Sequence, residues 1–333
     1  MIGANEHDLE MSTEEFQMIR DFILERSGIY FAENKMYLVK NRLAKRMAEL
    51  QIKTVRDYFY HVKYDTSMRE FNKLMDLVTT NETSFYRNEP QLLSFSEEVL
   101  PLLINEKIAD KGTKSIKIWS AGCSTGEEPY TLAILILERL RSPIGWNIEI
   151  IANDISEEVL QKARLGEYNG ITLRAVSPDI LNKYFTKNGE LYKVKPEVQS
   201  LVKFSHMNLN DSRKPSMVSG MDVVFCRNVM IYFTDEVKKQ LVRGFYNALR
   251  PGGYFYIGHS ETLHGISKAF KLVYFKNALV YQKEATPVAG TTSDPTATTS
   301  ALTKVAAGGA TSSASRALDL LSKIKAANAG IKK

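Results

Sequence analysis

A short apolar run, a loop of small residues and the start of a helix follow one another in Ile116-Lys-Ile-Trp-Ser-Ala-Gly-Cys-Ser-Thr-Gly-Glu-Glu-Pro-Tyr-Thr-Leu-Ala133. A strand, a glycine loop and a helix N-terminus in this order form the cradle that α/β folds build for a nucleotide-like ligand. Glycine is needed there because a Cβ would keep the main chain from approaching the ligand. The segment predicts an α/β fold with a ligand site at this loop; an ordinary strand-to-helix turn is the alternative.

The spacing of the glycines excludes two common ligand classes. Gly-Cys-Ser-Thr-Gly at residues 122–126 matches neither the Gly-x-Gly-x-x-Gly pattern of dinucleotide-binding enzymes nor a phosphate-binding loop that ends in Gly-Lys-Ser/Thr. This pattern argues against an oxidoreductase. Glu127 and Glu128 stand where a pyrophosphate would lie, which favours a ligand that carries a cation. S-adenosylmethionine (SAM) has a free ammonium, a sulfonium and no phosphate, and it fits this requirement.

Strand and helix patterns alternate from about residue 114 onward. Strands are predicted at residues 116–120, 148–153, 202–206, 221–226, 253–258 and 278–282, and helices at 127–141, 156–165 and 235–249. This alternation predicts a mostly parallel sheet covered on both faces. Residues 166–201 break the rhythm and predict a small β insertion with a hairpin around Asn188-Gly189.

Residues 12–110 have the pattern of an N-terminal all-helical domain. Ser12-Thr-Glu-Glu15 is a capping box ahead of apolar residues at helical spacing, and Gly28 ends that helix. Further helices are predicted at 34–50, 54–63 and 67–78. Five basic and no acidic residues lie between residues 35 and 48. We predict a substrate-docking surface there, against the alternative of a solvated helix face; its residues are Lys40, Arg42, Lys45 and Arg46.

The chain changes in composition after residue 284, where the α/β domain predicted at 111–284 ends. Of the thirty residues from 286 to 315, 25 are Ala, Thr, Ser, Gly or Pro, so residues 285–315 are predicted to form a disordered linker. Residues 316–333 carry a short apolar stripe. They are predicted to form a terminal helix that folds onto an unknown partner, or a tail without a function.

Composition and charge narrow the class of protein. The formal net charge is +6, but six basic and only two acidic residues lie in the tail from residue 285, so no nucleic-acid surface is expected in the remainder. No apolar run is long enough for membrane insertion, and the polar N-terminus lacks a signal-peptide core. Two cysteines form no disulfide framework or metal site. We expect a cytoplasmic monomer without a metal.

Polar side chains follow the predicted strands at the edge where ligands of open parallel sheets bind. Asp154 follows strand 148–153, where a carboxylate accepts hydrogen bonds from both ribose hydroxyls. Asn208 follows strand 202–206 and is placed to bond an adenine edge, with Leu209 packing on the base. Strand 221–226 ends in Arg227-Asn-Val-Met-Ile-Tyr-Phe233. With the glycine loop after strand 116–120, four strand ends carry suitable groups and indicate one convergent site.

Five motifs lie along the chain: Asn81-Glu-Thr-Ser-Phe-Tyr-Arg87, Ser124-Thr-Gly-Glu-Glu-Pro-Tyr130, Asn153-Asp-Ile155, Cys226-Arg-Asn-Val-Met-Ile-Tyr-Phe233 and Gly258-His-Ser-Glu261. From about residue 12 to 283 this combination resembles the CheR chemotaxis methyltransferases. That family transfers methyl groups from SAM to glutamate side chains of chemoreceptors, with S-adenosylhomocysteine as the second product. The resemblance implies a SAM-methyltransferase-like (Rossmann-like) α/β domain after the helical domain.

The resemblance also implies roles for residues. The implied cofactor contacts are Asn81, Thr83, Arg87, Glu127 or Glu128, Asp154, Asn208, Leu209, Arg227 and Asn228. Arg87 and Tyr232 match the positions nearest the transferred methyl and are the candidate catalytic residues. A glutamate nucleophile has a pKa of about 4.3 and is ionised at neutral pH, so no general base is required. The implied partners are chemoreceptor cytoplasmic domains.

Two alternatives to receptor methylation are considered. The first is another methyltransferase that acts on nucleic acid or on small molecules; amine-targeting DNA methyltransferases carry an Asp/Asn-Pro-Pro-Tyr string, and none is present. A SAM-binding regulatory or scaffold protein would not transfer methyl groups; the retained Arg87 and Tyr232 argue against it, and an activity assay decides. Some family members dock a receptor C-terminal peptide on the β insertion. The short hairpin at residues 185–192 leaves that docking mode open here.

Overall fold

The structure of the protein is a computed structural model that describes residues 9–110, 114–140, 142–211, 213 and 218–285. Apart from residue 285, the predicted linker at 285–315 and the terminal segment at 316–333 lie outside the described residues. The predictions for these two segments therefore stay predictions.

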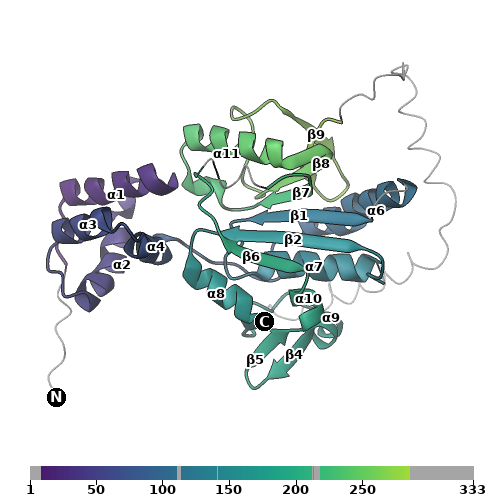
Figure 1. Ribbon diagram of the computed structural model, residues 1–333, viewed down its shortest axis with the longest axis horizontal. Coiled ribbons are helices and arrows are strands. Elements are labelled where there is room, and N and C mark those ends of the chain that lie inside the picture. Colours follow the sequence, from purple (N-terminus) through teal and green to yellow (C-terminus); the bar gives the residue numbers. More distant parts are fainter. Residues whose placement is uncertain (1–8, 111–113, 141, 212, 214–217, 286–333) are drawn as a thin grey trace, which may run out of the picture. The chain divides into compact units, whose positions relative to one another are not determined.

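A seven-stranded sheet forms the centre of the described chain (Figure 1). Its strand order is β6-β2-β1-β7-β8-β10-β9; the first five strands are parallel, and β10 and β9 pair antiparallel. The strands are β1 (Ser115–Ala121), β2 (Asn147–Asp154), β6 (Val202–His206), β7 (Met221–Cys226), β8 (Leu249–Ile257), β9 (Phe270–Tyr274) and β10 (Leu279–Lys283). The predicted mostly parallel sheet is confirmed.

Two strands differ from the sequence-based expectation. β8 starts at Leu249 rather than residue 253, because a register shift between Met221 and Val223 lets Leu249 pair with Met221. β9 was not predicted. It is an edge strand without a fully buried residue, so it lacks the apolar alternation that marks a half-buried strand.

The two faces of the sheet belong to two different apolar cores. Trp119 and Val224 pack in one core with α11 (Asp235–Ala248) and with the N-terminal helices. Ile118 and Phe225, their neighbours along the strands, pack in the other core with α7 (Glu127–Leu140). Successive side chains of a strand point to opposite faces, so one apolar run serves both cores.

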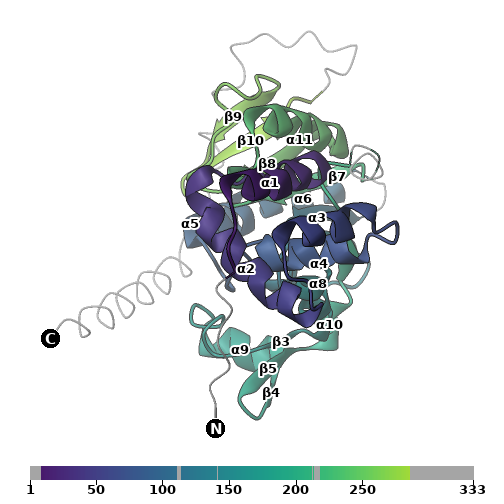
Figure 2. The same cartoon turned by 90° about the vertical axis from the view of Figure 1, so that its left-hand side faces the viewer.

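Four helices form the N-terminal domain and lie together at the front of Figure 2. They are α1 (Thr13–Ser27), α2 (Met36–Glu49), α3 (Val55–Tyr64) and α4 (Arg69–Val78). The capping box is confirmed, because the Ser12 hydroxyl accepts a hydrogen bond from the Glu15 N–H and the Glu15 carboxylate accepts one from the Ser12 N–H. Gly28 ends α1 with φ +77°, a left-handed conformation that favours glycine.

The helical stretch after this domain packs with the sheet. It comprises α5 (Glu89–Leu93), a π-helical turn (Ser94–Val99) and α6 (Leu100–Ala109). Phe95 and Leu103 from this stretch share a core with Ile116 of β1. The sequence analysis placed residues 89–109 in the helical domain, because a helical pattern does not reveal which core an apolar face joins.

The predicted β insertion is present as a three-stranded sheet in the order β3-β5-β4. It follows α8 (Glu157–Leu165) and contains β3 (Glu167–Tyr168), α9 (Pro178–Tyr184), β4 (Phe185–Asn188), β5 (Leu191–Val194) and α10 (Pro196–Gln199). The hairpin turns at Asn188-Gly189, as predicted, and Gly189 has a positive φ. The Tyr168 hydroxyl donates to the Thr125 carbonyl at 2.6 Å, which ties the insertion to the glycine loop.

The described part of the chain has neither a membrane-spanning helix nor a cluster of metal ligands. None of its helices combines the length and apolarity that crossing a bilayer requires. Within the same residues, no group of three or more His, Cys, Asp or Glu side chains is placed to hold a metal ion. The two cysteines, Cys123 and Cys226, are buried free thiols.

Candidate cofactor-binding and active site

A pocket of about 580 Å³ lies between the helical domain and the carboxyl ends of the parallel strands. Residues that follow β1, β2, β6 and β7 form one side of it, and the segment from Ile29 to Lys35 with Leu38 forms another. The volume falls within the range of about 300–1,000 Å³ that is usual for small-molecule sites. Ten residues predicted from the sequence line it: Asn81, Thr83, Arg87, Glu128, Asp154, Asn208, Leu209, Arg227, Asn228 and Tyr232.

The glycine loop bends sharply against the end of β2. The N–H groups of Gly122 and Cys123 both donate to the Asn153 carbonyl, at 2.8 and 2.9 Å. Gly122 has φ +77°, and a Cβ there would come within 2.4 Å of a methyl group of Val229. Glycine is required at this position for both reasons. The turn directs the Ser124 N–H toward the next strand end.

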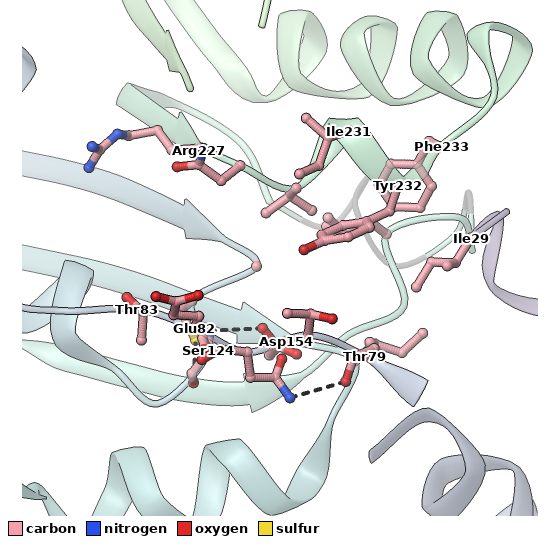
Figure 3. Close-up of a pocket in the computed structure, with 18 of the residues that line it drawn as sticks. Ile29, Thr79, Glu82, Thr83, Ser124, Asp154, Arg227, Ile231, Tyr232 and Phe233 are labelled. Atoms are coloured by element: carbon pink, nitrogen blue, oxygen red, sulfur yellow. Dashed lines mark hydrogen bonds between the residues drawn. The ribbon is translucent and has the colours of Figure 1, made fainter. Parts of the chain in front are cut away.

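Asp154 is a buried carboxylate on the pocket wall. It is 8% exposed and accepts a hydrogen bond from the Ser124 N–H at 2.8 Å (Figure 3). It accepts a second one from the Ser156 N–H at 3.0 Å. Burial raises the pKa of Asp154, and the N–H donors of Ser156 and Ser124 act in the opposite direction. No described Lys or Arg forms an ion pair with it. An oriented acceptor without a cation suits neutral donors, such as the hydroxyls of a ribose.

The two glutamates at the start of α7 have different surroundings, and only one reaches the pocket. Glu128 lines the pocket and accepts hydrogen bonds from the Ser120 hydroxyl at 2.7 Å and from Arg227 at 3.1 Å. Glu127 is 1% exposed, accepts the Thr125 hydroxyl at 2.6 Å, and lies outside the pocket wall. Adjacent helical side chains point about 100° apart, which explains the difference. Of the two, Glu128 is therefore the candidate for a cationic ligand group.

Arg227 organises the site through its guanidinium. Nε donates to Gln91 at 2.8 Å, Nη1 to Glu128 at 3.1 Å and Nη2 to the Arg87 carbonyl at 2.6 Å. Figure 3 shows this guanidinium directed away from Tyr232. The resemblance implied a cofactor contact for Arg227. In the structure its charged group is engaged by protein partners while the residue lines the pocket, and the cofactor contact stays a prediction.

The two candidate catalytic residues lie where the pocket meets solvent. Arg87 is exposed, and its guanidinium donates to the Glu82 carbonyl at 2.9 Å. Tyr232 is half-buried, and its hydroxyl is directed into the cavity (Figure 3). The Tyr232 carbonyl accepts a hydrogen bond from the Tyr30 N–H at 2.9 Å, so the helical domain helps to hold the tyrosine. The neighbouring Ile231 is 53% exposed.

Asn208 and Leu209 line the pocket at the end of β6. The Asn208 amide donates to the Arg26 carbonyl at 2.6 Å and accepts the Asn210 N–H at 3.0 Å. An asparagine amide has two donor hydrogens and two acceptor lone pairs, so one of each remains for an adenine edge. Leu209 is 9% exposed and offers an apolar contact. The predicted adenine site stays a prediction that this geometry permits.

The predicted docking residues on α2 fall into two groups. Arg42 donates to the carbonyls of Val78 and Thr79 at 2.6 and 3.1 Å. Arg46 pairs with Glu70 at 2.7 Å, and this hydrogen bond raises the pKa of Arg46. Arg42 and Arg46 are therefore engaged by partners within the helical domain, and Lys45 is exposed. The docking role of Lys40, Arg42, Lys45 and Arg46 stays a prediction.

Some residues of the site were missed by the sequence analysis. Lys35 lines the pocket from the helical domain, and the only sequence signal for it was its place at the start of the basic run. Gln91 fixes Arg227 from α5, and no motif indicated it. Burial raises the pKa of Cys123 well above its ordinary value, so this pocket residue is a neutral thiol. No histidine of the described chain lines the pocket.

Comparison with known proteins also divides the chain into a helical domain and a SAM-binding domain. Residues 14–79 match the CheR methyltransferase all-alpha domain, and residues 81–279 match the CheR methyltransferase SAM-binding domain. The chain belongs to the CheR methyltransferase family. The two matched ranges meet near residue 80. This agrees with the packing of residues 89–109 against the sheet.

Similar CheR proteins match along almost their full length. Chemotaxis protein methyltransferase 2 of Vibrio cholerae is 34% identical over 278 residues, which cover 83% of this chain and 95% of the relative. Chemotaxis protein methyltransferase 1 of Pseudomonas aeruginosa is 35% identical over 274 residues, covering 80% and 97%. Chemotaxis protein methyltransferase Cher2 of Pseudomonas putida is 34% identical over 273 residues, with the same coverage.

SAM is the cofactor of this CheR domain, and the residues present fit it. The buried Asp154 carboxylate has N–H donors but no cation, which suits the ribose hydroxyls. Glu128 supplies negative charge for the ammonium group beside its pair with Arg227. Leu209 and Asn208 offer the apolar and polar contacts that an adenine needs. The chain is therefore a SAM-dependent methyltransferase.

Proposed function

We propose that the protein transfers a methyl group from SAM to glutamate side chains of chemoreceptor cytoplasmic domains and forms glutamate methyl esters. One observation carries the proposal: the exposed Arg87 and the half-buried Tyr232 line the same pocket as the buried Asp154. An acceptor for the cofactor and a cation for a carboxylate thus face one cavity. The relatives named as chemotaxis methyltransferases support the choice of substrate.

Methyl transfer to a carboxylate requires alignment of the reactants but no general base. Bound SAM supplies an electrophilic methyl group. A glutamate carboxylate is already ionised at neutral pH, so the protein needs to align it and exclude water rather than remove a proton. Arg87 provides a planar fork of N–H donors that orients a carboxylate, and the Tyr232 ring borders the path to the methyl. Positioning of this kind lowers a barrier by up to about 7–11 kcal/mol.

The helical domain is the proposed contact for the receptor. Its α2 helix carries Lys40 and Lys45 on the same domain that supplies Lys35 to the pocket. Positive charge on this helix favours an approach by the acidic surface around a receptor glutamate. One chain supplies the pocket wall described here, so we also propose that the enzyme acts as a monomer.

The test is transfer of radiolabelled methyl groups from SAM to receptor-bearing membranes, followed by mild alkali. The proposal predicts base-labile label that is released as methanol, because carboxyl esters hydrolyse under these conditions. The control is a receptor in which the labelled glutamates are replaced by alanine, which should take up no label. Label that survives alkali would indicate N- or S-methylation. Clear SAM binding without any transfer would support the regulatory alternative instead.

A further inference from the structure

Glu261 lies in the turn after β8 and accepts hydrogen bonds from three main-chain N–H groups. Its Oε2 accepts from Gly258 at 2.6 Å and from Asn228 at 3.0 Å, and its Oε1 accepts from Ile231 at 3.1 Å. We propose that Glu261 is a positioning residue for methyl transfer, because it holds the loop that carries Asn228 and Tyr232. The inference rests on the proposed function for its effect on turnover.

The turn Gly258-His-Ser-Glu261 is built around this carboxylate. The Glu261 N–H donates to the Gly258 carbonyl at 2.9 Å and closes the turn. A Cβ at Gly258 would come within 2.6 Å of Glu261 Oε2 and 2.9 Å of the Asn228 nitrogen. Glycine is therefore required for the carboxylate to reach both the strand end and the loop. This gives a physical reason for a motif to which no role in the site was assigned.

The loop that Glu261 holds has an unusual backbone. Asn228 has φ +60°, in the left-handed region that residues other than glycine rarely adopt. Such a conformation persists where the surroundings over-determine it. The hydrogen bond from the Asn228 N–H to Glu261 is one such constraint. The hydrogen bonds of the neighbouring Arg227 side chain are another. Asn228 lines the cofactor pocket, so its conformation bears directly on the site.

Tyr232 depends on the same loop for its orientation. Its hydroxyl forms no hydrogen bond with any residue that the structure describes, so the ring is placed by its main chain and by packing. On one side of that main chain, the Ile231 N–H is held by Glu261. On the other side, the Tyr232 carbonyl accepts from Tyr30 of the helical domain. The Tyr232 N–H also donates to the Val229 carbonyl at 3.2 Å, within the 3-10 turn that contains Ile231. Loss of Glu261 would remove the side-chain anchor of this turn and leave the turn held by its own hydrogen bonds, by packing and by the helical domain.

The test begins with the variant Glu261→Gln, which keeps the shape of the side chain. A glutamine amide has one acceptor oxygen, and its NH₂ group would face an N–H donor, so at least one of the three hydrogen bonds is lost. We expect kcat for receptor methylation to fall by about tenfold to a hundredfold, the cost of misplacing a reacting group by a fraction of an ångström to 1 Å. We expect the KM for the receptor to change less than kcat. Ser260→Ala, at an exposed position of the same turn, is the matched control and should leave kcat unchanged.

A double-mutant cycle separates this role from general damage to the fold. Gly258→Ala should displace the carboxylate and reproduce the loss in kcat. The double variant Gly258→Ala with Glu261→Gln should lose no more than the worse single variant, because both changes remove one anchor. Losses that multiply in the double variant would overturn the proposal, as would an unchanged kcat in Glu261→Gln.

Hydrogen exchange supplies a readout that does not depend on activity. In the unmodified protein, the amides of Asn228 and Ile231 should exchange slowly, and in Glu261→Gln they should exchange at least tenfold faster while β1 amides stay protected. Fast exchange of both amides in the unmodified protein would overturn the proposal that Glu261 holds this loop, even if Glu261→Gln failed to fold. Failure of the unmodified enzyme to methylate receptors would count against the proposed function alone, because the exchange result does not need a substrate.

Discussion

The guanidinium of Arg227 donates a hydrogen bond to the main-chain carbonyl of Arg87 at 2.6 Å, across 140 residues of sequence. The same group pairs with Glu128 at the start of α7 and with Gln91 on α5. One buried cation therefore connects the end of β7, the first turn of α7 and the segment that carries a candidate catalytic residue. We therefore expect a substitution of Arg227 to displace both Arg87 and Glu128.

Arg227→Met should lower the free energy of unfolding by about 3–5 kcal/mol, because it leaves the Glu128 carboxylate without its cation in a mostly buried site. Urea denaturation measures this loss. The control is Arg164→Met, which breaks the more exposed pair of Arg164 with Glu157 and should cost less than about 1 kcal/mol. Equal losses in both variants would show that the Arg227 pair has no special role.

Asp154→Ala should abolish SAM binding, because the wall of the pocket loses its buried acceptor for the ribose hydroxyls. Isothermal titration calorimetry measures the affinity. Asp179→Ala, at an exposed position of α9, provides the control and should bind SAM as the unmodified protein does. Unchanged affinity in Asp154→Ala would remove this residue from the site.

The affinity for SAM should fall as the pH is lowered through the pKa of Asp154. Burial raises this pKa above the ordinary value of 3.8, so the loss begins at a higher pH than for an exposed aspartate. Protonation removes the charged acceptor, so the affinity is highest above the raised pKa and declines below it. Calorimetry in buffers of different ionisation enthalpy should also detect proton release on binding at acid pH. Affinity that stays constant over the acid range in which the protein is folded would contradict this assignment.

Arg87→Ala should retain SAM binding within about tenfold, or about 1.4 kcal/mol, while losing most methyl transfer. The reason is that Arg87 is exposed at the pocket and is assigned to the substrate carboxylate rather than to the buried part of the cofactor site. Calorimetry and the methyl-transfer assay measure the two effects separately. Arg87→Lys keeps the charge without the fork and should restore only part of the activity. Equal losses of binding and transfer would make Arg87 a cofactor residue only.

Substitutions of two neighbouring basic residues on α2 should affect different properties, receptor binding in one case and stability in the other. Lys45→Glu should raise the KM for the receptor without lowering the free energy of unfolding, because Lys45 is exposed. Arg46→Met should lower the free energy of unfolding by about 3 kcal/mol, because the carboxylate of Glu70, which is 6% exposed, loses its ion pair. Receptor kinetics and urea denaturation distinguish the two. A destabilised Lys45→Glu variant would argue against a docking role for this helix.

The sequence alone determined the frame of the molecule. The short apolar runs at residues 116–120 and 221–226 predicted strands, and the small residues at 120–126 predicted the turn between β1 and α7. Asp154 was found from its place after a strand. These features depend on local periodicity and on the rule that the carboxyl ends of parallel strands share one edge, so no long-range contact is needed to infer them.

Only the tertiary structure decided which side chains of this frame face the ligand. The partners of Arg227 lie 99 to 140 residues away in the sequence. Arg42 bonds the end of α4, and Arg46 pairs with Glu70 of α4 besides Glu49 of its own helix. From the sequence alone, either Glu127 or Glu128 was a candidate for the ligand, and residues 89–109 were assigned to the helical domain. In each case the contacts of a side chain depend on which distant segment the folded chain places next to it. A buried charged group needs a hydrogen-bond partner, and the sequence does not show which segment supplies that partner.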